Sequence, residues 1–291
     1  MNRIILEVKK LKKYYGIIPG IENVSFKLEE GSIYGFIGPN GAGKSTTIRT
    51  IMSLLNRTSG DIYLFGKKID RLDDDLKRKI GYLPSEINLY PDMTVKEILN
   101  YHALFYNGDL TKRRKELVKR LKIDESKKIE ELSFGNLKKV GIVLALMHNP
   151  SILILDEATS GLDPIMQKEF HDILREEKRL GTTILYSSHI LSEVSSICDK
   201  VIFIKNGKII KEDKIENIKN NNYTYLTIAS NDIKKIKKVF NFKIVSENEF
   251  EIKFINEMDP NILIDKLSDF KLDKLLIENI SLEDLFERYY K

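Results

Sequence analysis

The 291-residue sequence contains one cysteine and no long apolar stretch. The lone cysteine, Cys198, excludes an internal disulfide framework and is typical of a buried thiol in a reducing cytoplasm. The best candidates for a membrane span, Val140–Met147 and Ile152–Leu155, are shorter than the roughly 18 to 20 apolar residues that cross a bilayer. The N-terminal residues MNRIILEVKK alternate apolar and charged side chains, so we expect no signal peptide.

Excess charge is also scarce, because 48 Lys and Arg oppose 43 Asp and Glu and leave a net charge of +5. A nucleic-acid-binding protein is expected to carry a clustered basic face. The densest basic run, within Lys112–Arg120, recurs at helical spacing and indicates a solvated helix face. We therefore expect no nucleic-acid partner. The length exceeds the roughly 100–200 residues of one domain, which predicts a second, smaller domain.

The first two-thirds of the chain alternates strand and helix patterns, which indicates an α/β layer structure. The strand Ile33–Ile37 runs into a glycine-rich turn, and Ser45–Leu55 follows with one apolar helix face. Further short apolar runs, bounded by Gly, Pro or charged residues as buried parallel strands are, occur at Ile80–Leu83, Ile152–Leu155, Thr183–Ser187 and Val201–Ile204.

Between Tyr90 and His148 the strand signal disappears. Thr94 to Glu97 spells a capping box, which predicts the start of a helix. The helices expected in this stretch cover Val95–Phe105, about Lys112–Leu121, and a segment from about Asn136 to Asn149. We therefore expect a helical insert, over about residues 87–148, within an α/β core spanning residues 1–211.

Beyond the core, residues 212–222 are expected to form a linker, since Asn217–Asn222 is polar and asparagine-rich. Residues 223–291 are expected to form an α+β accessory domain, with a short closing helix between Ser281 and Tyr290. Its strand and helix patterns follow the ferredoxin-like order βαββαβ, over Tyr223–Ile228, Asp232–Phe240, Phe242–Val245, Phe250–Ile255, Pro260–Leu267 and Leu275–Ile280. This domain contains no cluster of potential ligands, so we assign it no chemistry.

A glycine-rich segment, GPNGAGKS at Gly38–Ser45, follows the first of these buried strands. It matches the phosphate-binding template G-x-x-x-x-G-K-[ST] in the strand–loop–helix context that this template requires. Glycines let backbone N–H groups close around phosphate oxygens, and a helix N-terminus favours negative charge. Lys44 can reach the β- and γ-phosphates, and Ser45 offers a hydroxyl to Mg²⁺. Such a loop alone fits kinases, GTPases and motors equally well.

Two acidic residues narrow the classes of protein that this loop allows. Asp156 and Glu157 follow the apolar strand that begins at Ile152. An acidic pair after a strand is often only a helix cap. Beside a phosphate-binding loop, however, Asp156 is placed to hold Mg²⁺ and Glu157 to orient or deprotonate the attacking water. The combination indicates nucleotide hydrolysis.

Further segments resemble motifs of the ABC ATPases. Leu132–Asn136, LSFGN, resembles the signature sequence, usually LSGGQ, and Ser160–Asp163 resembles the D-loop. His189 stands at the position of the switch histidine. Tyr15, just before Gly16, is similar to the aromatic residue that stacks on adenine. The resemblance covers about residues 3–211, with all motifs in family order.

The resemblance implies a P-loop NTPase core with an antiparallel β subdomain, and ATP and Mg²⁺ as its ligands. ABC cassettes dimerise head to tail, so Ser133 and Gly135 are expected to touch the γ-phosphate held by a second ATPase subunit. Asp163 and His189 would help to position the water. The catalytic candidates are Lys44, Glu157 and His189. The other ATP-binding candidates are Tyr15, Gly38, Pro39, Asn40, Gly41, Ala42, Gly43, Ser45 and Thr46. The metal candidates are Ser45, Asp156 and, through a water, Ser85.

The sequence departs from the family pattern at three positions. Ser85 replaces the glutamine that senses Mg²⁺ and touches the membrane subunit, so a water or the adjacent Glu86 substitutes, or coupling is looser there. Phe134 replaces the first signature glycine and Asn136 the glutamine. A ring at a helix entry can still pack, so we expect the site to retain activity.

The resemblance favours a transporter ATPase, peripheral on the cytoplasmic face of the membrane and paired with separate permease subunits. The pattern is most similar to subunits that pair with ABC-2-type export permeases, with antimicrobial or toxin peptides and drugs as the preferred substrates. An importer ATPase fits the variant motifs less well. A soluble ABC ATPase acting on ribosomes or DNA, and a regulatory cassette without activity, remain alternatives. Whether the second ATPase subunit is another copy or a different chain stays open.

Overall fold

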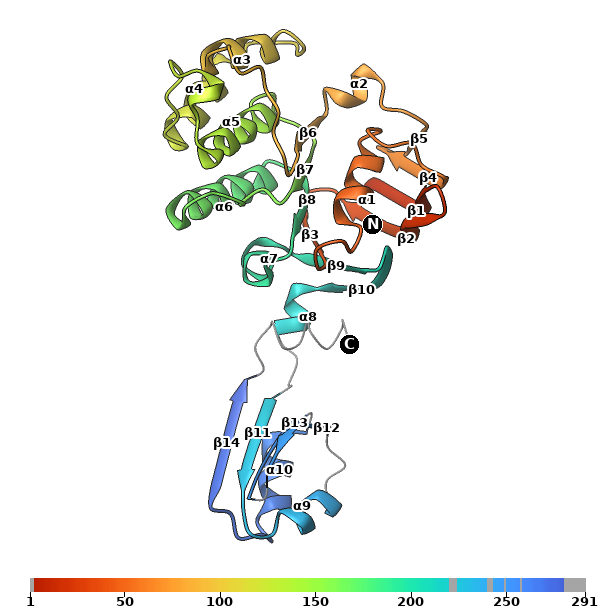
Figure 1. Cartoon of the computed structure of the whole chain (residues 1–291), viewed down its shortest axis with the longest axis vertical. Coiled ribbons are helices and arrows are strands. Elements are labelled where there is room, and N and C mark those ends of the chain that lie inside the picture. Colours follow the sequence, from red (N-terminus) through yellow and green to blue (C-terminus); the bar gives the residue numbers. More distant parts are fainter. Residues whose placement is uncertain (1–2, 220–223, 240–242, 249, 257, 280–291) are drawn as a thin grey trace. The chain divides into compact units, whose positions relative to one another are not determined.

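The computed structural model describes residues 3–219, 224–239, 243–248, 250–256 and 258–279 (Figure 1). The chain divides into two units, with the boundary between Ile215 and Glu216. In the described residues, the first unit holds a four-stranded and a six-stranded sheet, and the second holds a four-stranded sheet. Each unit has its own buried apolar core.

The six-stranded sheet forms the centre of the first unit. Its strands in spatial order are β10 (Lys208–Lys214), β9 (Lys200–Lys205), β3 (Ile33–Ile37), β8 (Thr183–Ser188), β7 (Ile152–Asp156) and β6 (Ile80–Leu83). All but the antiparallel edge strand β10 are parallel. Every residue of β3, β7 and β8 is buried, so the short apolar runs predicted as buried parallel strands are confirmed. Their carboxyl ends meet at one edge of the sheet, where open α/β sheets bind ligands.

The second sheet of this unit is antiparallel, as the resemblance implied. Its order is β2 (Ile18–Glu29), β1 (Ile4–Tyr15), β4 (Ser59–Leu64) and β5 (Lys67–Ile69). Leu6, Val8 and Leu11 of β1 are buried in the same core as Ile48 and Ile51 of helix α1 (Lys44–Ile51). This packing fixes the helix that follows the glycine-rich loop.

The helices of the core begin and end at recognisable signals. Helix α1 ends at Ile51, four residues before the predicted end, because Ser53 adopts a left-handed φ of 57°. Helix α6 (Pro164–Arg179) starts with proline at its first position and an Asp163 cap. The short helices α2 (Asp74–Lys77) and α7 (Leu191–Ile197) complete the core.

The predicted helical insert is present between β6 and β7. It contains α3 (Val95–Ala103), α4 (Thr111–Arg120), a 3₁₀ turn at Ile129–Glu131 and α5 (Phe134–Leu146). The capping box of Thr94 and Glu97 is confirmed, with both reciprocal hydrogen bonds formed. Helix α5 begins two residues before the predicted start, because the Ser133 side chain accepts the backbone N–H of Asn136 and caps it.

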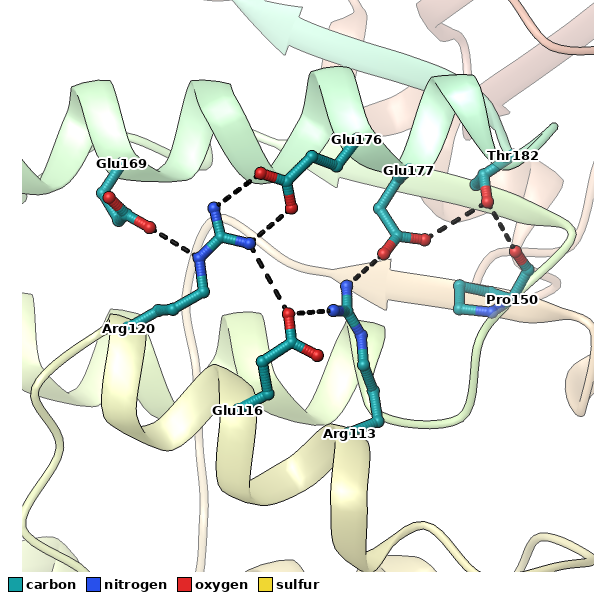
Figure 2. Close-up of polar contacts among 8 residues, drawn as sticks. All are labelled: Arg113, Glu116, Arg120, Pro150, Glu169, Glu176, Glu177 and Thr182. Carbon is teal, nitrogen blue, oxygen red and sulfur yellow. Dashed lines mark hydrogen bonds and ion pairs between the residues drawn. The ribbon is translucent and has the colours of Figure 1, made fainter.

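Arginines of α4 join the helical insert to α6 of the core, as Figure 2 shows. We call this the α4–α6 contact. Arg113 pairs with Glu177, whose side chain is only 2% exposed. Arg120 donates to Glu176 and to Glu169, where the Nε–Oε1 distance is 2.6 Å. The contact fixes α4 against α6, the helix that Asp163 caps.

The second unit has the sheet order β12 (Lys243–Glu247), β13 (Glu251–Asn256), β11 (Thr224–Ala229) and β14 (Lys274–Asn279), all antiparallel. Helices α9 (Ile233–Val239) and α10 (Pro260–Leu267) interrupt these strands in the predicted βαββαβ order. In the range expected as a linker, residues 212–214 continue β10 and Ile215–Lys219 form α8. The predicted closing helix after Ser281 lies outside the described residues.

Candidate active site

The glycine-rich loop joins the carboxyl end of β3 to the first turn of α1 (Figure 1). Gly41 (φ 78°) and Gly43 (φ 106°) are in the left-handed region, which glycine adopts without strain. A Cβ on Gly38 would lie 2.5 Å from the backbone oxygen of Ile204 in β9. The loop therefore lies tightly against the sheet, and the backbone N–H groups at the start of α1 are placed to bind an anion.

Burial changes along this loop. Pro39, Asn40 and Gly41 are exposed at its tip, Ala42 to Lys44 are buried, and Ser45 and Thr46 are half-buried. The backbone oxygen of Ala42 accepts the N–H of Gly207 at 2.9 Å. The loop is thus open at its tip and anchored from Ala42 onward, with Ser45 half-buried directly after the anchored part.

Lys44 opens α1, and its side chain is only 4% exposed. Its ammonium donates to the backbone oxygens of Gly38 at 2.7 Å and Pro39 at 3.3 Å. Desolvation lowers the pKa of Lys44, whereas the carboxylates of Glu157 and Asp156 act in the opposite direction. Lys44 Nζ lies 3.7 Å from Glu157 Oε1, so the ammonium connects the loop with the acidic end of β7.

Asp156 is the last residue of β7 and is fully buried. Ser187 Oγ on the neighbouring strand β8 donates to Asp156 Oδ1 at 3.1 Å. The other carboxylate oxygen, Oδ2, is buried and has no hydrogen-bond partner among the described residues. A buried polar atom without a partner is costly, and a hard cation or its bound water would satisfy it. The residues present therefore fit Mg²⁺.

Glu157 leaves β7 with a φ of 50°, a left-handed conformation that is uncommon for residues other than glycine. Its backbone N–H donates to Ser187 O at 3.1 Å. Its Oε1 atom lies 3.4 Å from His189 Nδ1 and 3.7 Å from Lys44 Nζ. The structure thus brings together the three residues that the sequence offers as catalytic candidates, from β7, α1 and the segment after β8.

A buried network behind His189 was not predicted from the sequence. The Glu193 carboxylate accepts hydrogen bonds from Thr159 Oγ1 at 2.8 Å, Tyr186 Oη at 2.9 Å and Ser188 Oγ at 3.1 Å. Burial raises the pKa of Tyr186 well above its ordinary value, so its hydroxyl stays protonated and donates. Through Glu193, the network connects Thr159 in the segment after β7 with Ser188, the residue preceding His189. A glutamate four residues after a histidine is no signal in the sequence by itself.

The segment after β6 lies beside the same strand ends. Tyr82 on β6 is half-buried, and desolvation together with the Asp156 carboxylate raises the pKa of Tyr82 to about 12. Ser85 follows this strand and is half-buried. Leu83 pairs with Leu155, which places Ser85 near the end of β7 that carries Asp156.

The signature candidates lie apart from this cluster, in the helical insert (Figure 1). Ser133 and Gly135 stand at the start of α5, and Gly135 packs so closely on the D-loop segment that a Cβ would lie 2.3 Å from Gly161 O. Asp163 caps α6 by accepting the Met166 N–H at 3.0 Å. The structure therefore does not bring Ser133 and Gly135 together with Lys44 and the strand-end acids in one chain.

Tyr15, the last residue of β1, is 48% exposed. A Cβ on Gly20 would lie 2.8 Å from its ring and 3.2 Å from the methyl group of Thr46. Lys13 Nζ lies 5.2 Å from the ring centroid. A half-exposed aromatic residue is thus placed close to the glycine-rich loop.

The fold, the phosphate-binding loop and the acids at the strand ends define a P-loop nucleotide hydrolase. Residues 21–160 match the ABC transporter family. The linearmycin resistance ATP-binding protein LnrL of Bacillus subtilis is 33% identical over 86% of this chain and 84% of its own length. The bacitracin transport ATP-binding protein BcrA of Bacillus licheniformis is 33% identical over 94% and 90% of the two chains. This chain belongs to the ABC transporter family, as one of its ATP-binding subunits.

A solved structure extends the comparison to the reaction. The dimeric post-hydrolysis state of the ATP-binding cassette MJ0796, bound to ADP and Pi, aligns with a TM-score of 0.67. The two chains are 27% identical, and the alignment covers 72% of this chain and 99% of that cassette. The predicted family, fold and activity are confirmed: the chain is an ABC ATPase that binds and hydrolyses ATP.

A membrane-crossing segment was sought among the helices of the described residues. None of these helices combines the length and the apolar character that a bilayer span requires.

Proposed function

We propose that this chain is the ATPase subunit of an exporter and that it powers a separate permease of the ABC-2 type. One relative is named for linearmycin resistance and another for bacitracin transport, and each aligns over at least 84% of its own length. These relatives support antimicrobial peptides and related drugs as the proposed substrates. The chain would act from the cytoplasmic face of the membrane as a peripheral subunit.

The position of Glu157 carries the proposed mechanism of ATP hydrolysis. Its carboxylate lies between Lys44 Nζ and His189 Nδ1, at 3.7 and 3.4 Å. In the proposed reaction Glu157 orients the attacking water and accepts its proton. Lys44 balances negative charge on the β- and γ-phosphate oxygens, and His189 helps to position the water and senses the γ-phosphate.

We propose that Asp156 and Ser45 hold Mg²⁺, and that Ser85 reaches it through a water molecule. A Mg²⁺ ion held by these residues would neutralise charge on the phosphate oxygens. The Oδ2 atom of Asp156, which is buried and lacks a hydrogen-bond partner within the described residues, supports this assignment. A serine hydroxyl keeps the polarity of the usual glutamine but not its length, so a water is needed between them. A magnesium-bound crystal structure without ordered water between Ser85 and the metal would count against this bridge.

The rest of the proposed ATP site has two parts. In this chain, the ring of Tyr15 stacks on adenine and the loop from Gly38 to Thr46 surrounds the phosphates. The other part comes from a second ATPase subunit, whose Ser133 and Gly135 touch the γ-phosphate and whose Asp163 helps to position the water. Helix α5 supports this role, because the N-terminus of a 13-residue helix favours anions. The dimeric state of the MJ0796 cassette also supports it.

Co-purification with membrane proteins, followed by ATPase assays, tests the proposal. The chain is isolated from membranes with the proteins that it binds, and the complex is assayed with bacitracin and other amphipathic antimicrobial peptides. We expect a multi-span membrane protein in the complex and faster ATP hydrolysis when the transported peptide is added. Recovery of the chain on ribosomes or DNA instead, with no membrane protein, would contradict the proposal.

A further inference from the structure

Lys138 is a buried lysine in the second turn of helix α5, with only 1% of its surface exposed. Lysine is almost never fully buried unless its ammonium has partners. Here Nζ donates to Ser85 O at 2.8 Å and to Pro84 O at 3.3 Å. Both acceptors are backbone oxygens of the segment that follows β6. One side chain of the signature helix therefore holds two consecutive peptide groups of that segment.

Phe134, one helical turn before Lys138, contacts a second segment. Its ring centroid lies 5.8 Å from Lys138 Nζ. The ring also packs against Gly161, where an added Cβ would lie 2.3 Å from it. Gly161 itself needs glycine, since its φ is 80°. The first two turns of α5 thus contact the segments after β6 and after β7 together.

These two segments lie on either side of the acids. The segment with Gly161 follows Glu157 along the chain, and the segment with Ser85 follows the strand beside β7. Desolvation lowers the pKa of Lys138, whereas the carboxylates of Asp156 and Glu157 act in the opposite direction, so its ammonium lies within their electrostatic reach. The ammonium adds positive charge on the side of these acids that faces α5.

We propose that Lys138 is a positioning residue that fixes the Pro84–Ser85 backbone to the start of α5, so that Ser85 keeps its distance to the magnesium site. This inference rests on the proposed roles of Asp156 and Glu157. It also links two departures from the family pattern. The short side chain of Ser85 needs a fixed backbone to hold one bridging water, and Phe134 covers the ammonium that fixes it.

The test compares Lys138→Met with Lys138→Arg in the whole chain. Methionine keeps the apolar stem and removes the donors, whereas arginine keeps the charge and can donate to both carbonyl oxygens. ATPase rates are measured while Mg²⁺ is titrated at fixed total ATP, and ATP affinity is measured in the presence of EDTA. Lys139→Met, which removes a half-buried lysine next along the same helix, is the matched control.

For Lys138→Met we expect the Mg²⁺ concentration at half-maximal rate to rise about tenfold, since a hydrogen bond from a charged donor is lost. Affinity for metal-free ATP stays as in the unchanged chain. Lys138→Arg recovers most of the Mg²⁺ response, and Lys139→Met leaves it unchanged. If Lys138→Met does not fold, Lys138→Gln, which keeps one short donor, is measured in the same way with an intermediate shift expected.

An unchanged Mg²⁺ response in Lys138→Met, or in the folded Lys138→Gln, would overturn the inference. A purely structural role is also distinguishable, because it would lower the rate and the metal-free ATP affinity together without shifting the Mg²⁺ response. The proposed hydrolytic site is judged separately from the Glu157→Gln chain. If that variant loses hydrolysis while Lys138→Met responds normally to Mg²⁺, only the role of Lys138 fails.

Discussion

The strand-end cluster of Lys44, Asp156, Glu157 and His189 and the α4–α6 contact are both networks of charged side chains, but they differ in what they leave unpaired. In the strand-end cluster Asp156 Oδ2 has no partner among the described residues, and the contacts of Glu157 are 3.4 and 3.7 Å long. In the α4–α6 contact (Figure 2) the carboxylates of α6 are closely paired with arginines, although Arg113 Nε has no hydrogen-bond partner in the part of the chain that the structure describes.

This difference distinguishes a network that binds a ligand from one that stabilises the fold. A carboxylate oxygen without a partner at the strand ends can bind a ligand, a metal or a water without any loss of contacts within the fold. The carboxylates of the α4–α6 contact are paired within the chain, so removal of a partner lowers the stability of the fold. We therefore expect substitutions in the first network to lower activity with little change in stability, and those in the second to do the reverse.

The largest effect on activity is expected for Lys44→Met. Removal of the ammonium takes away the positive charge nearest the phosphate-binding loop, and loss of one such group typically lowers turnover by about 10²–10³-fold. Stability should change little, because desolvation already opposes the charge of Lys44. Turnover is measured with excess ATP, and thermal unfolding without nucleotide. A loss of stability comparable with the loss of activity would remove the distinction between the two networks.

The largest effect on stability is expected for Arg113→Met. It leaves the buried Glu177 carboxylate without its cation, which costs about 3–5 kcal/mol. Arg120→Met, at a more exposed site of the same contact, is the matched control and should cost about 1 kcal/mol or less. Denaturant unfolding of both variants and the unchanged chain measures the difference. Equal costs would show that burial of the pair does not matter.

The same variant has a pH signature. Burial raises the pKa of Glu177 and Arg113 opposes that shift, so the variant raises this pKa further. A carboxyl group whose pKa is higher in the folded state holds its proton more tightly there. The contribution of this group to the free energy of unfolding is full below its pKa in the unfolded state. It is lost as the pH rises through its pKa in the folded state. The stability deficit of Arg113→Met should therefore shrink as the pH falls from neutral toward the ordinary pKa of a glutamate side chain; a constant deficit would contradict this origin.

A smaller effect, on both properties, is expected for Glu193→Gln. The amide replaces one acceptor oxygen by a donor, so the three hydroxyl groups around it cannot all keep their hydrogen bonds. We expect a loss of about 1–3 kcal/mol in stability and of about tenfold in turnover, because the segment before His189 loosens. Ser192→Ala, an exposed substitution on the same helix, is the control. Unchanged turnover would show that this network does not position the segment before His189.

Local patterns predicted much of this architecture. The short, bounded apolar run Ile152–Leu155 predicted a buried strand, which is confirmed, and the glycines of Gly38–Ser45, placed before a helix, predicted a phosphate-binding loop. Asp156 and Glu157 were predicted from their place at the end of a strand, whereas His189 was assigned from the resemblance to the ABC ATPases. The signals for the strand, the loop and the two acids each lie within a few consecutive residues.

The remaining features depend on contacts between distant segments. Lys138 looks like any lysine on a helix, and only the packing of α5 on the segment after β6 buries its ammonium. Arg113 and Arg120 were interpreted as a solvated helix face, which is wrong in part, because α6 supplies carboxylates that no local pattern can place. Tertiary contact overrides the local pattern at such positions.

The most direct test of the central claim is a comparison of ATP hydrolysis and ATP binding in the Glu157→Gln variant. Glutamine keeps the shape of the side chain but cannot accept the proton of the attacking water. We expect hydrolysis to fall by at least ~10²-fold, with the ATP dissociation constant unchanged. Near-normal turnover in this variant would remove Glu157 from the mechanism and with it the proposed role of the strand-end cluster.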